Sequence, residues 1–182
     1  MNRKSLIAVA VFAILGLVAI LSLRQPEKGE GAADRQRPLG KIVAADLDTI
    51  QILSGSVTTT LKRDAAGKTS VTTPVAYPAD EGNAKSAFEQ LEKLELGDLV
   101  TENKARHAEF QVDDAHALHV IAKSEKAGGK VLVDLLVGKI VGSGTMVRLA
   151  GKDEVWTAGG GIRGAFDHPT ADWRDRSITT FT

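Results

Sequence analysis

An uninterrupted apolar segment near the N-terminus constrains this chain more than any other feature. It runs from Leu6 to Leu23 without a charged side chain, and Ser22 is its only polar residue. A helix of this length spans roughly 27 Å, about the thickness of the hydrocarbon core of a bilayer. The segment is apolar on all sides, whereas a helix on the surface of a soluble domain needs a polar face. We therefore expect a transmembrane helix at residues 6–23.

The charges that flank this segment predict its orientation. Arg3 and Lys4 precede it, Arg24 follows it, and no acidic residue occurs before Glu27. Basic residues at a short N-terminal end keep that end in the cytoplasm, so the rest of the chain crosses the membrane. We expect a signal anchor at residues 1–24 that spans the cell inner membrane once and holds a periplasmic or otherwise extracytoplasmic C-terminal domain.

Two alternatives to an uncleaved anchor remain open. A cleaved signal peptide needs small residues just after its apolar core, and Gly31 and Ala33, which would suit, lie well beyond Leu23. The other alternative is a buried helix of a soluble domain.

The residues after the anchor predict a short tether and one domain. Residues 25–40 are polar, carry both signs of charge and contain two prolines. Such a segment cannot bury an apolar face, so we expect a flexible tether. Residues 41–182 then suffice for one domain with a single core. The chain has no cysteine, so no disulfide can stabilise this exported domain.

The charge balance bears on the class of partner. Three of the 23 basic residues flank the anchor, whereas all 23 acidic residues follow it, so the exported part has a small negative excess. Proteins that bind nucleic acid normally carry a basic excess or stripe. We therefore expect no nucleic-acid partner. The expected partners are the lipid bilayer, through residues 6–23, and a membrane protein complex.

The pattern of apolar residues predicts several strands and one main helix in the exported part. Alternating or β-branched residues between turn residues indicate strands, here at 49–53, 57–61, 69–73, 99–101, 118–122, 131–137, 145–149 and 154–157. Apolar residues at helical spacing follow Asp80, which can cap a helix, and Gly97 is expected to end that helix. No βαβ repeat is present. We expect an α+β fold in which one amphipathic helix packs on an antiparallel sheet.

Three histidines lie close together in the sequence and suggest a metal site. They are His107, His116 and His119, with Glu109, Asp113 and Asp114 among them. Imidazole and carboxylate groups bind zinc. However, no H-E-x-x-H spacing occurs, and a strand that begins at Leu118 would put the last two histidines on opposite faces. We assign no metal ligand and keep the three histidines as candidates only.

Two other motifs near the C-terminus resemble sites. Asp167, His168 and Asp172 could supply a general base or bind a cation, but no nucleophile accompanies them, so we assign no catalytic residue. The glycines of the segment GGGIRG, residues 159–164, have the spacing of a dinucleotide-binding loop. The sequence that follows has no room for the crossover helix and second strand which that loop requires. We expect a flexible loop and no cofactor.

Tryptophan beside arginine is a composition found at binding hot spots. The chain has two tryptophans, Trp156 and Trp173, and the second is followed by Arg174 and Arg176. We name these four residues as candidates for partner binding. The alternative is that each indole packs in the core while the arginines form surface ion pairs.

Several segments taken in order resemble a known family. They are Ile50-Gln51-Ile52, the strand at 57–61, the stretch Pro74-Val75-Ala76-Tyr77-Pro78-Ala79-Asp80, the hairpin from Val147 to Trp156, and the ending Asp172-Trp173-Arg174-Asp175-Arg176-Ser177-Ile178. This order resembles the bacterial envelope family known as domain of unknown function 4340 (DUF4340), over about Asp46 to Phe181. The resemblance implies a single-pass exported protein, and some members are similar to auxiliary components of ABC-type transport systems. Members are often longer or carry a repeated domain, so a truncated member remains possible.

The sequence therefore favours a membrane-anchored accessory or interaction protein of the bacterial cell envelope. One alternative is an envelope metal-assisted hydrolase that uses His107, His116 and His119 or the pair Asp167 and His168. A further alternative is a small-ligand or cell-wall binding module.

Overall fold

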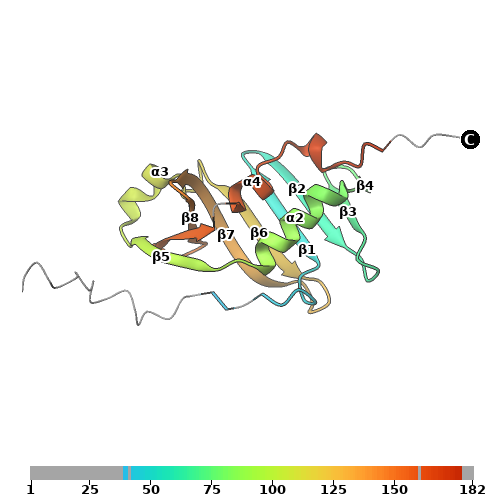
Figure 1. Cartoon of the computed structure of the whole chain (residues 1–182), viewed down its shortest axis with the longest axis horizontal. Helices are drawn as coiled ribbons and strands as arrows, with labels where there is room; N and C mark the ends of the chain where they lie inside the picture. Colours follow the sequence, from blue (N-terminus) through green and yellow to red (C-terminus); the bar gives the residue numbers. More distant parts are fainter. Residues whose placement is uncertain (1–38, 41, 160, 178–182) are drawn as a thin grey trace, which may run out of the picture. The chain divides into compact units, whose positions relative to one another are not determined.

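Nine strands form one antiparallel sheet in the computed structural model, which describes residues 39–40, 42–159 and 161–177 (Figure 1). The strands are β1 (Thr49–Ser54), β2 (Val57–Arg63), β3 (Thr69–Thr73), β4 (Tyr77–Pro78), β5 (Leu96–Thr101), β6 (Leu118–Ser124), β7 (Lys130–Val141), β8 (Gly144–Leu149) and β9 (Val155–Gly159). Their order across the sheet is β4-β3-β2-β1-β6-β7-β8-β9-β5, so β4 and β5 form the two edges.

The helices are few and short. They are α2 (Glu81–Glu92), α3 (His107–Phe110) and α4 (Ile162–Phe166), with 3-10 turns η1 (Lys104–Arg106) and η2 (Thr170–Trp173). The sheet and these helices confirm the α+β prediction. The predicted anchor at 6–23 lies outside the described residues, as does the tether except Leu39 and Gly40. Among the described residues, no helix has the length and apolar content needed to cross a membrane.

Helix α2 begins where the sequence predicts and ends earlier. The carboxylate of Asp80 accepts a hydrogen bond from the Asn83 amide at 2.9 Å, as expected of a helix cap. The helix ends at Glu92, however, because the backbone of Lys93 leaves the helical conformation, with φ −95° and ψ 4°. The prediction that Gly97 ends the helix is wrong, since this glycine lies in β5.

The main core lies between α2 and one face of the sheet (Figure 1). Alternate residues of the central strands point toward the helix, so Ile50 and Ile52 of β1 are buried together with Val120 of β6. Phe88 of α2 is fully buried against them. Helix α4 packs against α2, and its Phe166 completes the same cluster.

A smaller core lies under α3. Phe110 and Val112 pack on Met146 of β8 and Val155 of β9. The neighbouring Gly138 of β7 lies so close to this segment that it has no space for a side chain. This second cluster leaves part of the sheet uncovered on the side opposite to α2.

A buried carboxylate organises the turn between β6 and β7. Asp48 accepts hydrogen bonds from the amides of Glu125 and Lys126 at 2.9 and 3.2 Å, and from the Thr49 hydroxyl. Burial by itself raises the pKa of Asp48, but these hydrogen bonds outweigh it and hold that pKa below its ordinary value. The ionised carboxylate therefore stabilises the folded state.

We expect Asp48→Asn to lower the free energy of unfolding by about 1.5–3 kcal/mol at neutral pH, because charged hydrogen bonds are lost. The pKa is lowered on folding, so the contribution of Asp48 is present above about pH 4 and fades as the pH falls further. Denaturant unfolding of both chains at pH 7 and at pH 3 measures this. A difference between the two chains that grows on acidification would contradict it.

We expect Gly138→Ala to destabilise the domain by about 1–3 kcal/mol, because the added Cβ would meet the Phe110 carbonyl oxygen at 2.2 Å. Thermal unfolding of the full chain measures the effect. Gly164→Ala is the matched control, since a Cβ at that position in α4 has no neighbour within 4 Å. Equal melting temperatures for the two variants would argue against the close approach.

Candidate functional site

The three candidate histidines do not converge. His107 begins α3, is buried, and donates from Nε2 to the Asp153 carbonyl at 2.8 Å. His116 lies exposed in a turn and bonds to the Asp113 carboxylate. His119 lies on β6 and pairs with a different carboxylate on β7. Within the described part of the chain, no group of three histidine, cysteine, aspartate or glutamate side chains could hold a metal ion.

The remaining acids of this segment are also used locally. Glu109 forms a two-point ion pair with Arg106, and this hydrogen bonding lowers the pKa of Glu109. Burial by itself raises the pKa of Asp113, but the hydrogen bond from His116 contributes to a net lowering. Asp114 reaches the buried guanidinium of Arg148 at 3.4 Å. These carboxylates therefore stabilise the loop around α3.

The acidic residues and the histidine near the C-terminus also have separate partners. Asp167 bonds to Arg163 at 3.1 Å, and Asp172 pairs with Arg176. The ring of His168 meets the Trp173 indole edge-on, with 5.2 Å between centroids. Each of these three side chains therefore contacts a different group.

The glycine-rich segment is partly helical. Gly159 ends β9, and Gly161 precedes α4, which contains Gly164. The expectation of a flexible loop is therefore wrong for residues 162–164, which lie in α4. The reason is that the side chains of Ile162 and Phe166 are buried in the main core, which fixes this turn of helix.

Both candidate tryptophans are packed inside. Trp173 is fully buried, and Trp156 on β9 is 7% exposed. Both indoles therefore follow the alternative in which the tryptophans pack in the core. Their neighbours are at the surface, where the Arg174 guanidinium lies 4.2 Å from the centroid of the Tyr77 ring.

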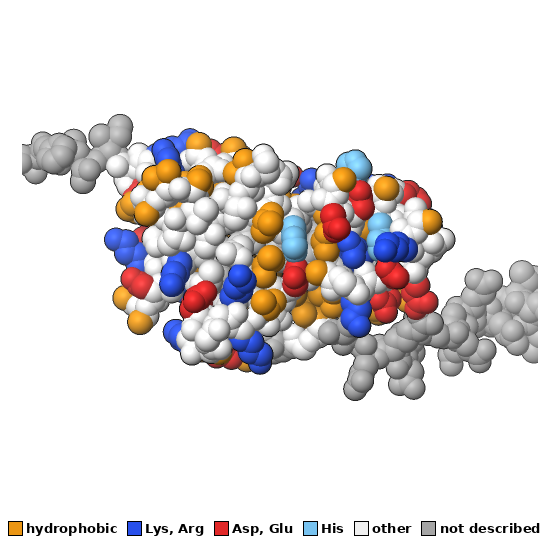
Figure 2. All heavy atoms as spheres, turned by 180° about the vertical axis from the view of Figure 1, so that it is seen from behind, with side chains coloured by type: hydrophobic (Ala, Val, Ile, Leu, Met, Phe, Trp, Pro, Cys, Tyr) orange, Lys and Arg blue, Asp and Glu red, His pale blue; other side chains and the backbone are white. Residues whose placement is uncertain are grey.

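The uncovered face of the sheet carries a histidine and aspartate pair. His119 donates from Nε2 to Asp134 Oδ1, and both side chains are about one third exposed. Leu53 and Leu136 lie beside His119 on the flanking strands. Figure 2 shows this side of the molecule, where a histidine and an acidic side chain interrupt a strip of hydrophobic side chains.

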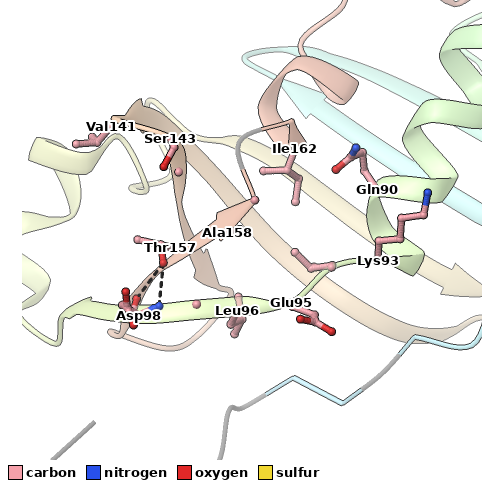
Figure 3. Close-up of a pocket in the computed structure, with 14 residues that line it drawn as sticks. Gln90, Lys93, Glu95, Leu96, Asp98, Val141, Ser143, Thr157, Ala158 and Ile162 are labelled. Carbon is pink, nitrogen blue, oxygen red and sulfur yellow. Dashed lines mark hydrogen bonds between the residues drawn. The ribbon is translucent and has the colours of Figure 1, made fainter. Parts of the chain in front are cut away.

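A hollow lies at the β5 edge of the sheet, and we name it the end groove (Figure 3). Its volume is about 610 Å³. Four segments line it: the end of α2 and the loop after it, the start of β5, the turn between β7 and β8, and the end of β9 with the start of α4. The lining residues are Gln90, Lys93, Leu94, Glu95, Leu96, Gly97, Asp98, Val141, Ser143, Gly144, Thr157, Ala158, Gly159 and Ile162.

An irregularity in β5 shapes one wall of the end groove. The pairing of β5 with β9 shifts between Leu96 and Leu99, and within this shift the Asp98 amide donates to the Thr157 hydroxyl at 2.8 Å. A side chain at Gly97 would place a Cβ 2.5 Å from that hydroxyl oxygen. Glycine is therefore required at this position by close approach.

The end groove has a buried apolar base and a polar rim. Leu94, Leu96 and Ile162 are buried, whereas Glu95 and Asp98 are exposed. Figure 3 shows the α2 side chains on one side and those of the β7–β8 turn on the other. This composition is typical of binding sites.

The charges on the rim are unevenly compensated. Lys93 forms an ion pair with Glu89 at 3.1 Å. No side chain of the described residues pairs with the carboxylates of Glu95 or Asp98. The residues that line the end groove include no histidine and no cysteine.

Sequence reasoning missed the end groove because its walls come from four distant segments. Gly97 was the one available signal, and it indicated a helix end. The pairing of His119 with Asp134 was also missed, although the Gly128-Gly129 turn and the alternation on both sides would have placed them close together on one face.

We expect Thr157→Val to speed hydrogen exchange at the Asp98 amide by roughly fivefold, because the lost hydrogen bond is worth about 1 kcal/mol. Thr157→Ser retains the hydroxyl and serves as the control. Exchange measured residue by residue on the full chain tests this. Similar rates in both variants would mean that the hydroxyl does not hold this amide.

The family model described as domain of unknown function (DUF4340) matches residues 70–182, more than half of the chain. The chain therefore belongs to this family, as the resemblance indicated, although the match begins at Ser70 rather than near Asp46. No curated protein and no solved structure matches the chain.

Proposed function

We propose that this member of the DUF4340 family is a single-pass, membrane-anchored accessory protein of the bacterial cell envelope, whose exported domain binds a protein partner. The observation that carries this proposal is the uncharged run Leu6–Leu23 between basic flanks, placed ahead of a small domain that has a groove with an apolar base and a polar rim. The N-terminus would be cytoplasmic and the domain periplasmic.

The chemistry of the domain supports a role in binding. His107, His116 and His119 each bond to a different group, and Asp167 is paired with an arginine rather than with His168. A metal-assisted hydrolase would need such groups to meet around one point. An accessory protein needs only a stable surface of defined shape and charge.

The position of residues 39 and 40, where the expected tether meets the domain, supports a partner in the same membrane. Leu39 and Gly40, at the end of the expected tether, line a hollow of about 420 Å³ that shares residues 93–96 with the end groove. A short tether raises the effective concentration of the domain for neighbours in the membrane. A component of an ABC-type transport system is the partner that the family resemblance favours.

Fractionation of cells that express the full chain tests the anchor. We expect the chain to stay in the membrane pellet after an alkaline wash and to be released by detergent. Leu15→Lys combined with Val18→Lys should abolish this, since each charge at the centre of a span costs about 2.5–3.5 kcal/mol. Leu15→Ile with Val18→Leu is the control. Recovery of the unaltered chain in solution without detergent would contradict the proposal.

Co-purification from native membranes tests the accessory role separately. A transport component recovered in constant proportion with the full chain is the expected result. Recovery of the chain alone at every detergent strength would leave the anchor intact and exclude a stable partner.

A further inference from the structure

The sheet face that is turned away from α2 carries apolar side chains at its centre. Along β6 the residues alternate, so Leu118 and Val120 join the main core, whereas His119 and Ile121 point to the opposite face. Strand pairing places aliphatic residues of β1 and β7 on this same face. Figure 2 shows hydrophobic side chains around a histidine there. The sheet strip is the name we give to the four aliphatic residues of this face: Leu53, Ile121, Val131 and Leu136.

The sheet strip has no part in the packing of either core. Leu53, Ile121 and Leu136 belong to neither core cluster of the described residues, and Val131 is 47% exposed. When one face of an antiparallel sheet lies in water, that face is normally polar. Exposed aliphatic side chains gathered at the centre of such a face therefore indicate a contact surface.

The sheet strip is about as wide as one helix. It lies mainly on β6 and β7, and neighbouring strands are about 4.8 Å apart, whereas a helix with its side chains is about 10–12 Å across. A second sheet would reach further and would bury Gln51 of β1 and Lys62 of β2, which point to the same face. A helix instead covers the apolar residues and leaves these two polar side chains at its rim.

The rim on the β1 side of the sheet strip is basic. Lys123 of β6 donates to the neutral amide oxygen of Gln51 at 2.7 Å. Lys62 is exposed and lies in the same row of residues across the strands. The acidic residue on this face, Asp134, is paired with His119. An occupant therefore gains from acidic residues on the side that faces the two lysines.

We propose that the sheet strip binds an amphipathic helix of a partner protein, whose apolar side chains lie on Ile121 and Val131. Its acidic side chains face Lys62 and Lys123. The bound helix forms a second helical layer on the sheet, opposite to the layer that α2 supplies. This inference rests on the proposed function and names the chemistry of its partner.

Stapled helical peptides test the proposal on the full chain in detergent micelles. The probe is a fluorescent peptide with leucines at positions i, i+4 and i+7 and glutamates on one flank of that face. It is compared with the same peptide carrying lysines instead of glutamates, and with one carrying serines instead of leucines. The signal from empty micelles is subtracted.

We expect the glutamate peptide to bind about fivefold more tightly than the lysine peptide by fluorescence anisotropy, since each exposed ion pair contributes little. The serine peptide should not bind, because it has no apolar face. Equal affinity of the glutamate and lysine peptides, or no binding of the glutamate peptide, would overturn the proposal.

Charge-reversal variants assign the basic rim. Lys62→Glu combined with Lys123→Glu should reverse the preference between the glutamate and lysine peptides. Lys68→Glu combined with Lys85→Glu is the matched control, because it makes the same change of charge in a hollow beside α2. The control should keep the preference of the unaltered chain. An unaltered preference in the first variant would place binding elsewhere and overturn the assignment.

A second pair of variants assigns the apolar contact. Val131→Ser should weaken binding of the glutamate peptide several-fold while the melting temperature stays the same. Val75→Ser is the control, because Val75 is 57% exposed and lies in the loop between β3 and β4. Equal affinities of the two variants for the glutamate peptide would contradict a contact at the sheet strip.

Two other occupants are measured separately. We expect sedimentation equilibrium of the full chain in micelles to show a monomer, and a dimer that Val131→Ser abolishes would overturn the proposal in favour of a second copy. We expect brominated lipid in discs with phosphatidylglycerol not to quench a probe at position 131, and quenching would overturn it in favour of a lipid surface. Fractionation measures membrane attachment by itself, so failure of the peptide experiment is distinguishable from failure of the proposed function.

Discussion

Packing of α2 onto the sheet is the constraint on which the rest of the domain depends, because the chain has no cysteine and the core must hold it together. Phe88 is fully buried in this contact, and the Arg63 guanidinium lies 3.7 Å from its ring centroid. The N-terminal end of the helix is fixed by the C-terminal turn, since the carbonyl of Trp173 accepts from the Asp80 amide at 2.9 Å. The other end leads directly into β5. The position of the end groove therefore follows from where α2 lies.

Titratable side chains in this domain mostly stabilise loops. Asp48 fixes the β6–β7 turn, Asp113 binds His116, and Arg148 holds the segment around Val112 through a 2.8 Å hydrogen bond to its carbonyl. The side chains of clusters that resemble functional sites in the sequence thus stabilise different parts of the fold. Within the described residues, Glu95 and Asp98 at the start of β5 are carboxylates without an ion pair.

The sequence predicts well the features that depend on neighbouring residues. The cap at Asp80 and the strand at Thr69–Thr73 follow from local patterns and are confirmed. The role of Gly97 could not be predicted, because its reason is the hydroxyl of Thr157, 60 positions later. The end groove is hidden for the same reason. Long-range contacts decide these positions, whereas periodicity reports only which side of an element is buried.

The sheet order shows that the family match covers only part of the sheet. The matched residues begin at Ser70, inside β3, yet β1 and β2 lie between β3 and β6 in the middle of the sheet. Residues 70–182 alone would form two sheet fragments with a gap of two strands and would expose the apolar side of α2. A unit that keeps the sheet continuous must therefore reach upstream at least to Thr49, where β1 begins, and Ile42 further upstream is buried in the same core. The residues matched by the family model are thus only part of one continuous sheet.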